Sequence, residues 1–407
     1  MRILILHNAY QQAGGEDVVV ADEMALLRAH GHHAFQHTVS NDIIQGPWRK
    51  AVTAWRTPYS DWGRLEAARA IEETRPDIIH VHNFFPLLTP SIYDAGRDMG
   101  VPIVQSLHNY RTVCAGTYLL RANRPCEDCV QGTPYRAVVH GCYRGSRVGS
   151  LAVARMVDYH RRHDTWTTKV DRFVALTEFA KSKFVEAGFP LDKIAVKPNS
   201  VALKNGSPAF RGDRQGGLFV GRLSPEKGIA TLLHAARLVD TPLRIVGDGP
   251  LFETLKRNES ESMAVLGRKP PTEVVEEMSR AAFLIMPSEW YEGCPMTLLE
   301  AFSQGLPVIA SRLGAMAEII EGGATGLLFT PGDAEDLAAK MRWAASHAEE
   351  MRRMGEAAYR AYLEKYTPER NYQTLMTVYR DAIAARRKSV IVGPVDEIAR
   401  SSSRRAS

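Results

Sequence analysis

Both halves of this 407-residue chain repeat one pattern, in which a short apolar run is followed by a loop and then by a helix-like segment. Such runs read as strands buried on both faces, and strands that alternate with helices form parallel sheets. The sequence therefore predicts an α/β protein with two doubly wound parallel sheets that face each other across a ligand cleft. The expected strands cover residues 2–7, 77–81, 103–107 and 173–176, with one more that starts at Ile194, then 217–220, 243–246, 282–286, 308–311 and 326–329.

The predicted domain boundary lies in a polar linker near residues 205–213. The expected units are an amino-terminal domain over 1–205, a carboxy-terminal domain over 206–366 and a further helix over 367–387. Residues 388–407 end in Ser-Ser-Ser-Arg-Arg-Ala-Ser and are expected to be a disordered tail.

Bulk properties narrow the function classes. No apolar run approaches the ~20 residues of a transmembrane helix, and the apolar start is too short for a secretory signal, so we expect a cytoplasmic protein. The net charge of +5 and the absence of a recognisable motif do not favour nucleic-acid binding.

Residues 111–172 nevertheless hold eleven Lys and Arg against five Asp and Glu. That stretch suits either peripheral contact with the inner face of a membrane, a phosphate-bearing acceptor, or a solvated basic face.

Three loops of the second half carry chemistry. Residues 221–228 read Gly-Arg-Leu-Ser-Pro-Glu-Lys-Gly and lead from a strand into a helix start, which suits an anion. Arg222 and Lys227 could bracket a diphosphate there or be ordinary surface residues. The Gly-Asp-Gly-Pro turn at 247–250 can bring backbone close to a ligand. Glu292, in a loop, and Glu300, on the next helix, could accept hydrogen bonds from sugar hydroxyls.

In this order the motifs of residues 217–330 resemble the donor domain of family-four retaining glycosyltransferases, which have the GT-B fold of two Rossmann-like domains. The resemblance implies that Glu300 binds the donor ribose, Glu292 the transferred sugar, and Arg222 with Lys227 the leaving diphosphate. It places Arg268 beside the nucleobase, makes 1–205 the acceptor-side domain and 206–366 the donor domain, and implies that the helix over 367–387 packs back on the first domain. The remaining donor-binding positions implied are Gly221, Gly247, Gly249, Gly293, Cys294, Pro295, Met296 and Thr297.

The first half resembles the same family. Gly14 and Gly15 are similar to its glycine loop, and residues 106–111, Ser-Leu-His-Asn-Tyr-Arg, to its histidine loop in a subgroup that continues Asn-Tyr-Arg. A lone histidine at a strand end is commonly structural, but the resemblance implies that His108 contacts the donor sugar.

The resemblance also implies the reaction. Arg222 and Lys227 would stabilise the charge on the leaving diphosphate without a divalent metal. The configuration would be retained, by front-face attack or, as the weaker alternative, through Glu292 as a covalent nucleophile. The expected donor is a UDP- or GDP-sugar. The expected acceptor is a lipid-linked saccharide of a surface polysaccharide.

Four cysteines, Cys114, Cys126, Cys129 and Cys142, fall within 29 residues of a long loop over 108–149. In a cytoplasmic chain this clustering favours a closed structural zinc site that staples the loop, with His140 as a substitute ligand. An iron–sulfur cluster or free thiols remain alternatives. Cys294 is expected to be simply a small residue.

Three rival functions make different demands on the sequence. A nucleotide-sugar epimerase would lack the Glu-x7-Glu helix, and a non-catalytic scaffold would be expected to lose Arg222, Lys227 or Glu300. An oxidoreductase would need Gly-x-Gly-x-x-Gly after the first strand, and Gly14-Gly15 lacks the third glycine.

Overall fold

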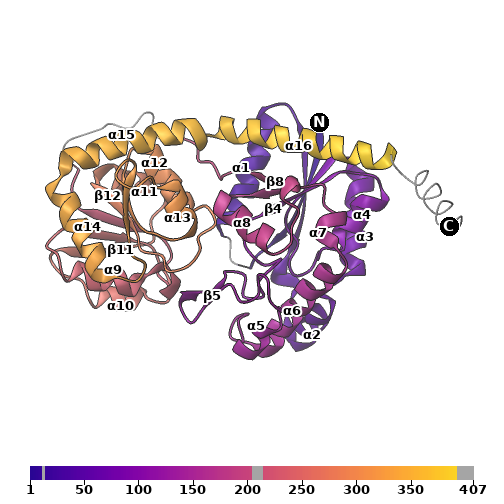
Figure 1. Ribbon diagram of the computed structural model, residues 1–407, viewed down its shortest axis with the longest axis horizontal. Coiled ribbons are helices and arrows are strands. Elements are labelled where there is room, and N and C mark those ends of the chain that lie inside the picture. The colour runs from indigo at the N-terminus through magenta and orange to yellow at the C-terminus, as the bar shows by residue number, and fades with distance from the viewer. Residues whose placement is uncertain (12–13, 204–213, 392–407) are drawn as a thin grey trace, which may run out of the picture.

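The computed structural model describes residues 1–11, 14–203 and 214–391, the last three without their side chains. It contains two α/β units that lie side by side, with the amino-terminal unit indigo to magenta and the carboxy-terminal unit orange (Figure 1). Each unit is built on a six-stranded parallel sheet. The predicted fold class is therefore confirmed.

The amino-terminal sheet is centred on β1, whose residues pair with β2 from Arg2 opposite His33 to Ala9 opposite Ser40. Its strands, in spatial order, are β2 (His33–Ser40), β1 (Arg2–Ala9), β3 (Ile78–Asn83), β4 (Ile103–Leu107), β7 (Arg172–Ala175) and β8 (Ile194–Val196). The segment after β4 forms a small hairpin of β5 (Leu120–Arg121) and β6 (Arg124–Pro125). The helices are α1 (Gly15–Ala29), α2 (Gly46–Arg56), α3 (Asp61–Thr74), α4 (Ile92–Asp98), α5 (Arg136–His140), α6 (Arg147–Arg162), α7 (Thr165–Thr168) and α8 (Glu178–Glu186), with short 3-10 turns η1 (Asn41–Ile43) and η2 (Leu191–Lys193).

The carboxy-terminal sheet repeats this plan. Its strands, in spatial order, are β11 (Met263–Gly267), β10 (Leu243–Val246), β9 (Gly217–Val220), β12 (Phe283–Met286), β13 (Val308–Ser311) and β14 (Gly326–Phe329). The helices are α9 (Ile229–Ala236), α10 (Phe252–Lys256), α11 (Pro271–Arg280), α12 (Met296–Ser303), α13 (Gly314–Ile319), α14 (Ala334–Ser346) and α15 (Ala348–Lys365), with the 3-10 turn η3 (Pro225–Lys227).

A last helix, α16 (Pro368–Ile391), joins the two units along one side of the molecule (Figure 1). Its side chains Leu375 and Val378 share a hydrophobic core with Ile3 and Val104 of the first sheet. Helix α16 thus packs on the unit in which the chain begins. The tail predicted from Lys388 starts too early, because α16 continues to Ile391; the rest of that prediction, residues 392–407, lies outside the described residues.

Two of the four edge strands of these sheets, β2 and β11, were missed by the sequence analysis. In β2 buried and exposed positions roughly alternate, and its sequence, His-Ala-Phe-Gln-His-Thr-Val-Ser, is largely polar. An edge strand is covered by neighbours on fewer sides, so it lacks the continuous apolar run of a central strand. In the residues that the model describes, no helix is both long and apolar enough to cross a bilayer.

Candidate donor and acceptor site

The first donor loop follows β9 and is fixed by glycine backbone. Gly228 has φ +69°, and a Cβ there would lie 1.9 Å from the carbonyl oxygen of Pro287. A Cβ on Gly247 would lie 1.9 Å from the carbonyl oxygen of Gly221. No side chain fits at such distances, so the three predicted loops after β9, β10 and β12 are packed backbone to backbone at one edge of the sheet. Gly249 packs likewise against Leu223.

Two predicted site residues meet in this cluster. Lys227 Nζ lies 2.6 Å from Glu292 Oε1, and the same oxygen accepts hydrogen bonds from Ser288 Oγ at 2.7 Å and Trp290 Nε1 at 3.0 Å. Glu292 is only 5% exposed. Three donors on one oxygen hold the carboxylate in a single position, and Lys227 balances its charge.

Further predicted donor residues belong to the same domain. Arg222 and Arg268 are exposed, and neither guanidinium makes a hydrogen bond or an ion pair within the described part of the chain. Met296 and Thr297 are the first two residues of α12 after Pro295, so their amide groups have no acceptor in the helix itself. Such free amides attract an anion. Glu300 lies on the same helix, eight residues after Glu292, and is partly buried.

The donor loop reaches the first domain at two backbone points. A Cβ on Gly293 would lie 3.3 Å from the carbonyl oxygen of His108. Asn199 Nδ2 donates to the carbonyl oxygen of Cys294 at 2.9 Å. Burial raises the pKa of the Cys294 thiol to about 12, so this side chain is a neutral, buried small residue. His108 and the donor loop therefore belong to one site, although they come from different domains.

The long loop after β4 also contacts the donor loop. The rings of Tyr118 and Trp290 meet edge to face with centroids 4.7 Å apart, and Tyr291 OH donates to Glu127 Oε1 at 2.8 Å. Elsewhere Glu318, on α13, accepts from two backbone amides at the start of α8 at 2.9 and 2.7 Å. These contacts hold the two domains together beside the site.

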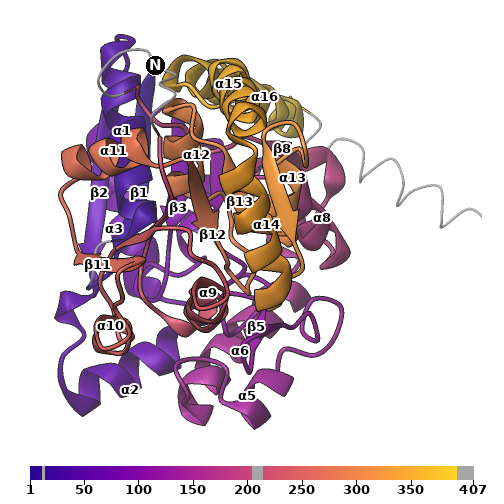
Figure 2. The same cartoon turned by 90° about the vertical axis from the view of Figure 1, so that its left-hand side faces the viewer.

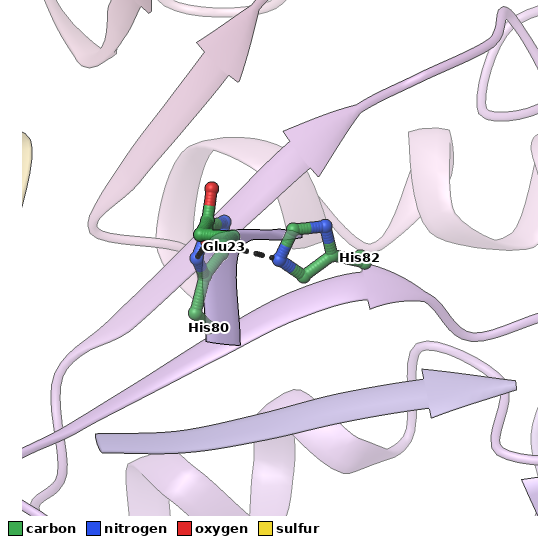
Figure 3. Close-up of side chains that lie close together, drawn as sticks. All are labelled: Glu23, His80 and His82. Atoms are coloured by element: carbon green, nitrogen blue, oxygen red, sulfur yellow. Dashed lines mark hydrogen bonds and ion pairs between the residues drawn. The ribbon is translucent and has the colours of Figure 1, made fainter. Parts of the chain in front are cut away.

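His108 lies at the end of a buried row of polar side chains that are joined by hydrogen bonds. Its Nε2 lies 2.9 Å from His82 Nδ1, and His82 Nε2 lies 3.2 Å from Glu23 Oε1. His80 Nδ1 lies 2.8 Å from the same carboxylate oxygen, so Glu23 bridges the two histidines of β3 (Figure 3). Burial lowers the pKa of His82 to about 4, and burial together with His82 holds the pKa of His108 well below its usual range. Both imidazoles are thus neutral at neutral pH.

Glu23, His80 and His82 form the only group of three or more His, Cys, Asp or Glu in the described ranges whose ligand atoms lie within 4.8 Å of one another. Lys197 Nζ, however, lies 3.1 Å from Glu23 Oε2. Burial alone would raise the pKa of Glu23, but Lys197 and the imidazoles hold that pKa well below its usual range. The carboxylate already has a cation partner that would repel a metal ion, so the group is a hydrogen-bonding centre.

A second polar pair, partly buried, lies beside the glycine loop. Tyr10 OH donates to Glu16 Oε2 at 3.1 Å, and Glu16 follows Gly14 and Gly15 at the start of α1. Burial raises the pKa of Glu16 to about 8 against the opposing charge of Arg111. A Cβ on either glycine would meet no atom within 4 Å, so open space adjoins them.

The four clustered cysteines are free thiols in one loop. None belongs to a group of three ligand atoms within 4.8 Å over the part of the chain that the structure places. Burial raises the pKa of the Cys129 thiol to about 12. The loop is also anchored by apolar side chains, because Cys114, Leu119 and Val130 all pack in the main core of the first domain. Zinc binding stays a prediction.

Several residues of the site had no role assigned from the sequence, although Glu16, Arg111, Trp290 and Tyr291 lie within predicted motifs. They are Glu23, His80, His82, Lys197, Tyr10, Glu16, Arg111, Tyr118, Glu127, Trp290, Tyr291 and Asn199. One signal was available. Residues 78–83 read Ile-Ile-His-Val-His-Asn, and two histidines in an otherwise apolar buried strand must find polar partners inside the protein.

Comparison with known proteins supports the division of the chain into two domains. The family model described as Glycosyltransferase Family 4 matches residues 3–205, and the model described as Glycosyl transferases group 1 matches residues 205–361. The sulfoquinovosyl transferase of Arabidopsis thaliana is 27% identical over 338 residues, which cover 80% of this chain and 61% of that protein. The lipopolysaccharide 1,6-galactosyltransferase of Salmonella typhimurium is 29% identical over 229 residues, which cover 53% of this chain and 62% of that protein. The chain thus spans about three fifths of the length of these relatives.

Among solved structures, HepE from Anabaena in complex with UDP shares the fold. The TM-score is 0.64 at 18% sequence identity, over 93% of this chain and 99% of that one. The predicted GT-B arrangement is confirmed by this likeness.

Proposed function

This chain belongs to the glycosyltransferases that join a family 4 amino-terminal domain to a group 1 carboxy-terminal domain, and we propose that it transfers a sugar from a nucleoside-diphosphate sugar to a saccharide acceptor. The observation that carries the proposal is the pair of Lys227 and Glu292 beside the free amides of α12, with His108 of the other domain against the same loop. A cation, an anion-binding helix start and a carboxylate suit a diphosphate joined to a sugar.

The chain's own residues divide the task by charge. Arg222, Lys227 and the α12 amides would stabilise the diphosphate as the sugar–phosphate bond breaks, without a divalent metal. Lys227 would then share its protons between the diphosphate and Glu292, which frees the carboxylate to accept from a sugar hydroxyl. Glu300 would bind the ribose, and Arg268 would lie beside the base.

We propose that the configuration is retained by front-face attack, with the diphosphate helping to deprotonate the acceptor. Glu292 suits a binding role better than that of a covalent nucleophile, because its Oε1 accepts hydrogen bonds from Lys227, Ser288 and Trp290. Those bonds lower the electron density that a nucleophile needs.

For the donor we propose a UDP- or GDP-sugar, and for the acceptor a lipid-linked saccharide in surface polysaccharide synthesis. Support for the acceptor comes from the Salmonella relative, which is a lipopolysaccharide galactosyltransferase. Support for the donor base comes from HepE, whose structure contains UDP.

Release of nucleoside diphosphate from a panel of UDP-, GDP- and ADP-sugars tests the proposal. We expect slow hydrolysis of one donor that EDTA leaves unchanged and that Lys227→Ala and Glu300→Ala abolish. Lys256→Ala, an exposed lysine of the same domain, is the matched control and should retain full activity. If no donor is hydrolysed or bound, the chain is better described as a non-catalytic scaffold. Conversion of the nucleotide sugar without diphosphate release would identify an epimerase.

A further inference from the structure

Helix α2 (Gly46–Arg56) turns an apolar face toward solvent. None of its residues is buried, yet it carries two tryptophans, Trp48 and Trp55, which are 78% and 72% exposed. Positions 48, 52 and 55 follow the i, i+4, i+7 spacing of one helix face, with Val52 between the two rings. A large apolar stripe that covers no core marks an interaction surface.

Two chain segments at this face carry basic residues and no acidic ones. Residues 43–60 contain three Lys and Arg and no Asp or Glu, and residues 129–157, which include α5 and most of α6, contain four Arg and no Asp or Glu. Arg49, Lys50 and Arg56 are exposed beside the tryptophans. Such a patch attracts an anionic surface and repels a basic one.

Further exposed apolar side chains extend the stripe onto the neighbouring helices. Val139 at the end of α5 is 68% exposed and Val148 at the start of α6 is 74% exposed. α6 packs between α5 and α2, and the guanidinium of Arg155 lies 4.8 Å from the ring centroid of Trp55. Both views place α2, α5 and α6 together along the lower edge of the molecule (Figures 1 and 2).

We propose that this surface, formed by α2, α5 and α6, docks the protein on an anionic lipid bilayer, with Trp48 and Trp55 inserted among the headgroups. Tryptophan suits that layer because its ring is apolar and its N–H is polar, and arginines beside it contact the lipid phosphates. A protein partner explains the exposed rings but gives no reason for two segments that lack any acidic residue.

The surface formed by α2, α5 and α6 lies where a membrane-held acceptor would need it. Helix α2 follows β2, and the segment with α5 and α6 follows β4, so both leave the sheet at the carboxyl ends of parallel strands, as His108 does. A bilayer against this surface would therefore lie on the site's side of the first domain. This step rests on the proposed function, since it matters for catalysis only if the acceptor is held in a membrane.

Vesicle co-sedimentation tests the surface without any donor or acceptor. The purified chain is mixed with vesicles of pure phosphatidylcholine or with added phosphatidylglycerol, at low and high salt. We expect binding that needs the anionic lipid and weakens with salt, and a partition at least about tenfold lower for Trp48→Ser/Trp55→Ser and for Arg49→Gln/Lys50→Gln/Arg56→Gln. The control Leu191→Ser/Leu363→Ser changes two exposed apolar residues elsewhere and should bind like wild type.

Two results would overturn the proposal. One is that the wild-type protein does not bind anionic vesicles. The other is that the tryptophan variant and the basic-residue variant both bind them as well as wild type does. If the wild-type protein does not bind vesicles but forms a concentration-dependent dimer that the tryptophan variant does not form, the surface is an interface between copies of the chain. Donor hydrolysis without lipid should be unchanged in the tryptophan variant, so a failure of the docking surface is distinguishable from a failure of the transferase assignment.

Discussion

His82 Nδ1 lies 2.9 Å from His108 Nε2, and this contact fixes where the proton of His108 sits. Glu23 is a carboxylate and can only accept, so the proton of its contact with His82 lies on His82 Nε2. His82 is neutral, so its Nδ1 must accept, and the proton between the rings belongs to His108 Nε2. The Nδ1 of His108 is left as an acceptor, which suits a sugar hydroxyl.

Replacing His82 tests this positioning role. We expect His82→Phe to lower kcat of donor hydrolysis roughly 10- to 100-fold with a smaller change in KM, because His108 loses the partner that orients it. His82→Asn should retain more activity, since its amide oxygen can accept in place of Nδ1. His163→Phe, an exposed histidine, is the control. Nitrogen-15 spectra of the histidines should show the Nε2–H form of His108 in wild type; the other tautomer would contradict the mechanism.

The ion pair of Lys227 and Glu292 should be strong because Glu292 is buried. A double-mutant cycle of Lys227→Met and Glu292→Gln, followed by urea unfolding, should give a coupling free energy of about 1–3 kcal/mol. Lys256 and Glu259 make an exposed ion pair at 2.9 Å and serve as the matched control, with an expected coupling that is much weaker because solvent screens both charges. Equal coupling in both pairs would show that burial adds nothing to the first.

The donor loops could be predicted because their chemistry is local in sequence. Each predicted motif follows a strand that its own apolar run reveals, and Lys227 and Glu292 meet because the ends of β9 and β12 are neighbours in one parallel sheet. The motifs and their order along the chain were therefore enough to predict which loops form the site of the second domain.

The contacts between domains could not be predicted in this way. Glu127 and Tyr291 are 164 residues apart, and only the tertiary arrangement brings them to 2.8 Å. Glu23 lies in the middle of a helix whose sequence marks it as one more acidic surface residue, but Lys197, from beyond β8, neutralises it inside the core. Pairs of this kind follow from packing rather than from any spacing.

The carboxyl of Glu16 gives stability a specific dependence on pH. Its pKa in the folded chain is raised to about 8 by burial, so between pH 4.5, the ordinary pKa, and pH 8 the folded chain holds a proton that the unfolded chain has lost. Stability therefore falls as pH rises through that window, by up to about 1.4 kcal/mol per pH unit. Urea unfolding from pH 5 to 8 should show this slope in wild type and its loss in Glu16→Gln.

The control for Glu16 is Asp336→Asn. Burial raises the pKa of Asp336, but hydrogen bonds from Thr330 and the charges of Lys340 and Arg312 together bring that pKa below its ordinary value, so Asp336 titrates at more acidic pH. The difference between wild type and this variant should stay constant from pH 5 to 8. Parallel curves for wild type and Glu16→Gln would mean that Glu16 ionises in the folded chain as it does in the unfolded one.

Two glycines with similar backbones separate conformational strain from steric overlap. Gly31 has φ +77° with open space around its Cα, and Gly228 has φ +69° but faces the carbonyl of Pro287. We expect Gly31→Ala to cost about 1–2 kcal/mol of unfolding free energy and Gly228→Ala roughly 3–5 kcal/mol, with loss of donor binding. Thermal unfolding and donor titration measure both. Similar costs at the two positions would mean that the donor loops are not packed as described.

The cysteine loop gives the remaining prediction. The four thiols lie in one loop but have not converged on a common centre, so a zinc ion would have to draw their sulfur atoms together. We expect the purified protein to contain about one zinc per chain by elemental analysis. Cys126→Ser/Cys129→Ser should lose the zinc and unfold at lower temperature, while Cys294→Ser, buried elsewhere, should keep it. Iron with visible absorbance would indicate an iron–sulfur cluster instead. Metal-free protein of unchanged stability would show that the loop is held by its apolar packing alone.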